Sequence, residues 1–172
     1  MSDSVKNFRN AVRSLVQDWQ NAGLPSRQGL ERAADTVMAQ RRQLGVAGIW
    51  GNDTPVMVTA TVDDGMGQGL SIIEKFADAI GIRIIRLGLM QPVDAVVATC
   101  HRHQPDYLGL TVLQFDTEDE IADIARALPT KTRIVAGGPV FNADPEFAAR
   151  AGVHYAAQDA CAFLDFMVKT AE

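Results

Sequence analysis

The pattern of hydrophobic positions divides the chain into two parts. Apolar residues recur every three or four positions over residues 4–22, which predicts an amphipathic helix. A Gly-Leu-Pro-Ser sequence ends this pattern, and its serine, Ser26, suits the N-cap of a second helix that reaches residue 44. The glycine-rich stretch 45–54 is typical of a linker. We therefore predict an N-terminal helical segment over residues 1–46.

From residue 55 onward, short β-branched runs alternate with helical patterns. The predicted strands are 56–62, 82–87, 107–113, 133–136 and 153–156, and the predicted helices are 70–80, 92–103, 118–128, 145–151 and 160–169. Strands that alternate with helices are joined by right-handed crossovers, so neighbouring strands run parallel. The pattern predicts a flavodoxin-like, doubly wound α/β domain with a five-stranded parallel sheet over residues 55–172. Ligands of such folds bind beyond the carboxyl ends of the strands.

Composition limits the classes of partner. Hydrophobic residues make up 47% of the 172 positions, which is enough for a buried core. The formal net charge of -5 argues against a general nucleic-acid-binding protein. The sequence has no apolar run of transmembrane length, no basic helix face for a membrane surface and no signal-peptide core at its N-terminus. We therefore expect a cytoplasmic protein that acts on neither nucleic acid nor membrane.

The most informative stretch is the turn Asp64-Gly65-Met66-Gly67-Gln68-Gly69, between the first predicted strand of the sheet and the helix that follows. Phosphates, nucleotides and cofactors bind at such turns, because free N–H groups and the helix dipole meet there. Further candidate residues follow the other strand ends: Gly88, Thr111, Leu113, Gly137 and Gly138. The carboxyl edge of the sheet is therefore the candidate binding site.

Two common ligand classes fit this edge poorly. A dinucleotide site needs GxGxxG and an acidic residue about twenty positions further on, whereas the turn reads GxGxG and residues 84–86 are Ile-Ile-Arg. A phosphoreceiver domain would use Asp63, Asp64 and Asp116, but it needs a lysine at the end of the fifth strand. Residues 153–159 contain no lysine.

Several positions in order resemble the cobalamin (B12)-binding domain family. That family has Asp-x-His-x-x-Gly after its first strand, a glycine that ends the next helix, and Leu-Gly after its second strand. Here Asp64, Gly69, Gly81 and Leu87-Gly88 stand at that spacing. The family order continues with Thr111-Val112-Leu113, Gly137-Gly138, and Ala151-Gly152 followed by Tyr155. The chain resembles corrinoid methyl-carrier proteins in particular.

The resemblance implies a corrinoid cofactor with an extended nucleotide tail. Gly69, Gly137 and Gly138 resemble the positions that keep the slot for the tail open, and Thr111 resembles the hydroxyl that lines it. The corrin ring would lie on the loops 64–68, 88–91 and 114–117. The cofactor-binding residues that the resemblance implies are Asp64, Gly65, Met66, Gly67, Gly69, Gly88, Thr111, Leu113, Gly137 and Gly138.

Met66 departs from the family, because it stands where the family has the histidine that binds cobalt. A thioether is a neutral, weak donor and has no N–H group that Asp64 could accept. Met66 can therefore make only a weak contact with cobalt. Three outcomes stay open: a corrinoid with a weak or absent lower ligand, a different tetrapyrrole such as haem, or an empty site in a fold kept for protein contacts.

The resemblance implies a corrinoid-binding carrier or accessory subunit that serves a partner methyltransferase in methyl transfer. No nucleophile–base pair stands at the predicted strand ends, so a cofactor carrier is favoured over an independent enzyme. The alternative function is a degenerate sensor or adaptor that acts through protein contacts. The helical segment 1–46 is shorter than the four-helix cap of methyl carriers. We predict that it pairs two copies of the chain into a homodimer.

Overall fold

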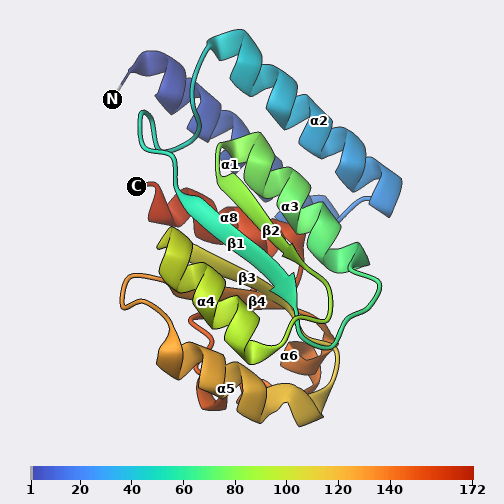
Figure 1. Cartoon of the computed structure of the whole chain (residues 1–172). Coiled ribbons are helices and arrows are strands. Elements are labelled where there is room, and N and C mark those ends of the chain that lie inside the picture. The colour runs from blue at the N-terminus through green and yellow to red at the C-terminus, as the bar shows by residue number, and fades with distance from the viewer. Residues whose placement is uncertain (1) are drawn as a thin grey trace. The chain divides into compact units, whose positions relative to one another are not determined.

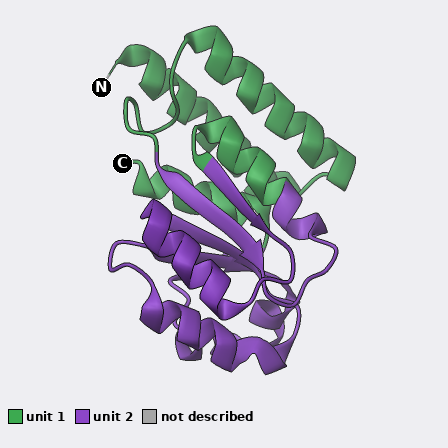
Figure 2. Ribbon diagram, in the orientation of Figure 1, with its two compact units in different colours: residues 1–54, 72–83, 159–172 green, residues 55–71, 84–158 purple. Residues whose placement is uncertain are grey.

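The computed structural model describes residues 2–172 and contains two compact units (Figure 2). Unit 1 holds the chain up to residue 54 together with residues 72–83 and 159–172. Unit 2 holds residues 55–71 and 84–158. The predicted domains, residues 1–46 and 55–172, are consecutive segments of the sequence, and this division stays a prediction.

Unit 1 is helical and encloses the apolar face of its first helix. It contains α1 (Asp3–Ala22), α2 (Arg27–Leu44), most of α3 (Gln68–Ile80) and α8 (Ala160–Thr170). Helix α1 packs against α8, and the ring of Trp19 meets that of Phe76 edge-on at 5.6 Å. The apolar surface that the homodimer prediction assigned to a second copy is thus buried within the chain, and the homodimer itself stays a prediction.

The stretch 45–54 is a packed connection rather than a loose linker. The buried guanidinium of Arg9 donates to the carbonyl of Ile49 from Nε at 3.1 Å and from Nη2 at 2.6 Å. The N–H of Ile49 donates in turn to the carbonyl of Ile80 at 3.0 Å. Gly48 lies so close to Gly81 that a Cβ on either would stand 2.5 Å or less from a backbone atom of the facing segment.

Unit 2 is built on the sheet, whose strands are β1 (Val56–Thr61), β2 (Arg83–Gly88), β3 (Tyr107–Thr111), β4 (Arg133–Gly137) and β5 (Tyr155–Ala156). The strand order is β2-β1-β3-β4-β5 and all five strands are parallel (Figure 1). This is the flavodoxin-like order, in which β2 lies on one side of β1 and β3 on the other, so the switch point of the strand order lies between β1 and β3. The predicted fold class is confirmed.

One face of this sheet forms the core of unit 2. Helices α4 (Val93–His103) and α5 (Glu118–Ala127) lie side by side (Figure 1). Their buried residues join alternate strand residues in one apolar cluster, which includes Val58, Ala60, Leu108, Leu110, Ile134, Val96, Cys100, Ile121 and Ile124. Because side chains alternate along a strand, the strand residues between these point to the other face of the sheet.

Two predicted boundaries differ from the structure. Strand β3 ends at Thr111, so Leu113 lies in the loop beyond it. The helix predicted over 145–151 is found as the shorter α7 (Phe147–Arg150), and another short helix, α6 (Pro139–Ala143), was not predicted. Pro139 starts α6, a position that suits proline because its missing N–H group needs no partner there. Among the helices of residues 2–172, none has both the length and the apolar character that a bilayer crossing requires.

Candidate functional site

Asp64 closes the glycine-rich turn at the end of β1. Its carboxylate is buried, and Oδ1 accepts hydrogen bonds from the backbone N–H groups of Met66 at 2.7 Å and Gly67 at 2.9 Å. This is the local turn that aspartate side chains favour. Within residues 2–172, no hydrogen bond reaches the second oxygen, Oδ2. The residue predicted to orient an axial ligand thus shapes its own loop and keeps one acceptor free.

Thr61 joins the first loop to the second. Its hydroxyl donates to the carbonyl of Asp64 and accepts the N–H of Met90 at 2.9 Å. The carbonyl of Thr61 accepts the N–H of Gln91 at 2.7 Å. Met90 has the left-handed backbone angle φ of 53°, which costs a non-glycine residue about 1 kcal/mol and is stabilised by these bonds. The sequence analysis missed Thr61; a threonine at the end of a buried strand was the available signal.

Asp63 joins the first loop to the third. Its Oδ2 accepts from the N–H groups of Leu113 at 3.0 Å and Gln114 at 2.8 Å, and from the hydroxyl of Thr117 at 3.2 Å. The sequence analysis considered Asp63 only as a metal ligand of a phosphoreceiver domain. The end of β1 therefore holds all three loops at the carboxyl edge in one hydrogen-bonded arrangement.

These three loops carry large apolar side chains that are open to solvent. We call this set the apolar edge: Met66, Leu89, Met90, Leu113 and Phe115. Met66 is 75% exposed and Met90 is 59% exposed. Exposed apolar groups gathered on connected loops mark a binding surface rather than a solvated one. The apolar edge coincides with the loops on which the sequence analysis placed a flat ring.

Small polar residues line the ends of the three central strands. Thr61, Thr111 and Gly137 are partners in register across β1, β3 and β4. Because side chains alternate along a strand, this row faces away from the apolar core of unit 2. Thr111 is 8% exposed, and its hydroxyl has no hydrogen-bond partner in the described part of the chain. A ligand group that reached this row would find an available hydroxyl.

The predicted glycines divide into two kinds. Gly138 has φ of 131°, and a Cβ there would stand 2.0 Å from the carbonyl oxygen of Val112, so the fold itself requires glycine. At Gly137 a Cβ would stand 3.1 Å from the carbonyl oxygen of Ala157. At Gly69, by contrast, a Cβ would meet nothing within 4 Å. Gly69 is exposed, so the space beside it is open to solvent and the packing of the chain does not require glycine there.

The remaining predicted glycines shape the loops that carry the apolar edge. Gly65 is exposed in the first loop, next to Met66. At Gly67 a Cβ would stand 2.6 Å from a methyl group of Leu89, so the first two loops are in close contact. Gly88 ends β2 and begins the second loop.

Comparison with known proteins identifies the family. The sequence profile of the B12 binding domain matches residues 55–163. The chain belongs to the B12-binding domain family. A comparison with curated proteins found no significant match.

Solved structures show the same fold. A novel cobalamin-binding protein from Desulfitobacterium hafniense is 19% identical, with a TM-score of 0.79 over 96% of this chain and 80% of that one. The methanol:cobalamin methyltransferase complex from Methanosarcina barkeri is 14% identical, with a TM-score of 0.66 over 98% and 67%. The monomethylamine corrinoid protein from the same organism is 14% identical, with a TM-score of 0.60 over 95% and 80%.

No histidine of this B12-binding domain stands at the carboxyl edge of the sheet. The three histidines lie near the opposite edge, where the strands begin. His101 and His103 end α4, and the chain then enters β3 beside the start of β1, where the N–H of Asp106 donates to the carbonyl of Val56 at 2.8 Å. His154 precedes β5, and its Nδ1 accepts the N–H of Ile134 at 2.9 Å. None of the three therefore replaces the imidazole that is missing at Met66.

Neither cysteine offers a thiolate in place of the imidazole that is missing at position 66. Burial raises the pKa of Cys100 in α4 to about 11, so this thiol stays protonated at neutral pH. Burial also raises the pKa of Cys161, and its Sγ lies 3.6 Å from the carbonyl of Val16 within unit 1. Residues 2–172 contain no group of three or more histidine, cysteine, aspartate or glutamate side chains that could hold a metal ion.

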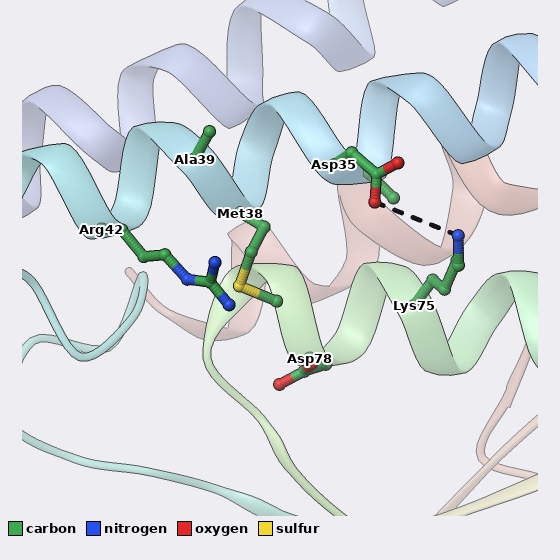
Figure 3. Close-up of a pocket in the computed structure, with 7 residues that line it drawn as sticks. Asp35, Met38, Ala39, Arg42, Lys75 and Asp78 are labelled. Carbon is green, nitrogen blue, oxygen red and sulfur yellow. Dashed lines mark ion pairs between the residues drawn. The ribbon is translucent and has the colours of Figure 1, made fainter.

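A pocket in unit 1 is a separate feature (Figure 3). Its lining residues come from α2 and α3 and are Ala34, Asp35, Met38, Ala39, Arg42, Lys75 and Asp78. The lining carries charges of both signs, and the Nζ of Lys75 lies 4.0 Å from a carboxylate oxygen of Asp35. It shares no residue with the loops of the candidate site.

The site residues fit a corrinoid in two respects and fail in a third. The apolar edge suits the flat face of a macrocycle, and the hydroxyl of Thr111 and the open space at Gly69 lie at the positions where the sequence resemblance implies the nucleotide tail. Position 66 lacks the imidazole that would bind cobalt from below. The fit is therefore to the ring and the tail, and not to an axial bond through nitrogen.

Proposed function

We propose that this protein binds a corrinoid and serves as a carrier or accessory subunit for a partner methyltransferase. The observation that carries the proposal is the apolar edge, five large exposed side chains on loops held together by the end of β1 in a B12-binding domain. The fold is shared with a methyltransferase complex and with a methylamine corrinoid protein. The comparisons concern corrinoids throughout and give no support to haem.

Different residues bind the corrin ring and the nucleotide tail. Met66, Met90 and Phe115 present their exposed side chains to the ring and shield that part of it from water. Thr111 offers its hydroxyl to the tail, and Gly69 leaves space for it. The corrinoid supplies a cobalt centre that accepts and donates a methyl group. Asp63 and Asp64 hold the loops that carry these residues by accepting backbone N–H groups.

The lower face of cobalt receives no nitrogen donor from this chain in the proposed complex. Met66 stands at the ligand position, and the histidines near the amino edge are the only imidazoles in the sequence. A thioether is soft and weakly basic, so Met66 contributes contact area more than a coordinate bond. A corrinoid at this site would therefore be held by the apolar edge and the residues beside the tail, without a histidine ligand from this chain.

The first test is uptake of hydroxocobalamin by the purified protein. The full chain should remain coloured after gel filtration and show an altered visible spectrum. A protein that binds neither hydroxocobalamin nor dicyanocobinamide would contradict the proposal and favour the adaptor function.

Replacing Met66 with histidine should restore an axial bond. The free Oδ2 of Asp64 is available to accept the imidazole N–H, which orients the ring and raises its basicity. Affinity for cob(II)alamin should rise about tenfold, the scale of one hydrogen bond to a charged group. Electron paramagnetic resonance of the bound Co(II) form should show coupling to the histidine nitrogen, in a sample with the cofactor's own base labelled with ¹⁵N.

Met66→Leu is the matched control, because leucine keeps an apolar side chain and has no donor atom. It should bind like the wild type if the thioether does not coordinate cobalt. A Met66→His variant with wild-type affinity and no nitrogen coupling would show that residue 66 does not lie below the cobalt.

A further inference from the structure

We propose that Asp63 is the positioning residue that presents the third loop of the apolar edge to the cofactor. The inference rests on the proposed corrinoid-binding function and adds a residue that the family resemblance did not mark. Asp63 follows β1 by two positions, whereas its hydrogen-bond partners lie 50 to 54 positions further along the chain. It therefore links two loops that only the fold brings together.

Beyond the end of β3, hydrogen bonds to Asp63 take the place of the hydrogen bonds between neighbouring strands. The last ladder bond at this point joins the N–H of Val112 to the carbonyl of Gly137 at 2.9 Å. The next two N–H groups, of Leu113 and Gln114, donate to the Asp63 carboxylate instead. Without this acceptor both groups would depend on water for a partner, since no other hydrogen bond of theirs is found in residues 2–172.

The third hydrogen bond of Asp63 fixes the start of α5. The hydroxyl of Thr117 lies 3.2 Å from Oδ2 of Asp63 and donates to the carbonyl of Gln114 at 2.8 Å. The loop between Leu113 and Thr117 is thus held at both ends by one carboxylate. Phe115 lies within it, and its ring meets the ring of Phe147 edge-on at 6.1 Å.

This geometry orders the loop before any ligand arrives. Leu113 is 40% exposed and Phe115 is 52% exposed, so packing on the core covers only part of each side chain. A loop that is already ordered loses less conformational entropy on binding, and this strengthens affinity. Asp63 thus acts on the ring through the loop and does not itself form part of the apolar surface.

The test compares Asp63→Asn with Asp116→Asn in the full chain. Asparagine keeps the size of aspartate but loses the negative charge and one of the two acceptor oxygens, so the charge-assisted hydrogen bonds from the loop become weaker neutral ones. Asp116 lies in the same exposed loop and makes no hydrogen bond or ion pair with the described residues, so it controls for the loss of one negative charge. Dicyanocobinamide, which has the corrin ring without the nucleotide tail, probes the ring site alone.

Asp63→Asn should weaken binding of dicyanocobinamide and of hydroxocobalamin by the same factor, about tenfold. Asp116→Asn should bind both as the wild type does. Amide hydrogen exchange in the peptide containing residues 113–117 should accelerate in Asp63→Asn alone. The visible circular dichroism of the bound corrin should also weaken, because the ring would lie in a less fixed environment.

Thr117→Val supplies a second variant that leaves the charge of Asp63 in place. It removes one of the three donors and should weaken dicyanocobinamide binding about threefold. Wild-type affinity in Asp63→Asn, or an equal loss in Asp116→Asn, would overturn the inference while the proposed function stands. Failure of the wild-type chain to bind either corrinoid would overturn both.

Discussion

Replacing Gly138 with alanine should destabilise the protein by about 3 kcal/mol or more. The residue has φ of 131°, a conformation that side chains disfavour, and its Cβ would stand 2.0 Å from the carbonyl oxygen of Val112. That carbonyl belongs to the segment that leaves β3, whose N–H is fixed by the carbonyl of Gly137 at 2.9 Å. The clash therefore cannot be relieved without shifting the ends of two central strands.

Urea denaturation followed by circular dichroism measures this effect through the unfolding midpoint. Gly69→Ala is the control, because alanine is favoured over glycine in a helix and its Cβ would meet nothing within 4 Å. It should leave the free energy of unfolding within about 1 kcal/mol of the wild-type value. Equal stability of the two variants would mean that the backbone at Gly138 relaxes freely.

The sequence alone could not show that Gly138 and Gly69 differ in this way. Both follow a strand, and the family resemblance gave them the same role beside the nucleotide tail. The structure separates them, because the carbonyl of Val112 excludes a side chain at one position and open space surrounds the other. The fold requires glycine at position 138 whether or not a ligand binds. The packing of the chain does not require glycine at position 69, so a substitution there can test where the ligand lies.

The fold itself was predictable because each element has a local cause. Short apolar, β-branched runs mark β1 and the strands beside it, and Ser26 caps α2 by accepting the N–H of Gly29 at 3.3 Å. The prediction missed α6, which depends on a glycine with positive φ at position 138 and on Pro139, and it made α7 too long. No periodic pattern can develop over helices of five and four residues.

The candidate site was predictable only in its location. Asp64 and Met66 stand in a sequence motif, so the first loop was found. Thr61 was missed and Asp63 was not recognised as a link between loops, because their partners Met90 and Leu113 lie 29 and 50 positions away. Only the order of the parallel strands brings these loops to one edge, and no local pattern records which backbone groups a side chain will meet there.

Replacing Gly69 with leucine should reduce affinity for hydroxocobalamin about 100-fold, the largest loss expected of any site variant. The change keeps the fold, since leucine is a good helix former and a Cβ at this position meets nothing within 4 Å. In the proposed complex the nucleotide tail occupies that space. Dicyanocobinamide has no such tail, so its affinity should stay within about twofold of the wild-type value.

Ser71→Leu is the matched control for Gly69→Leu. Ser71 is exposed on the same helix, two positions further on, and therefore points to a different side of it. It should bind both ligands as the wild type does. Equilibrium dialysis with each corrinoid gives the two dissociation constants directly. If Gly69→Leu bound hydroxocobalamin as tightly as Ser71→Leu, the tail would lie away from α3, and Thr111 and Gly137 would lose their proposed place beside it.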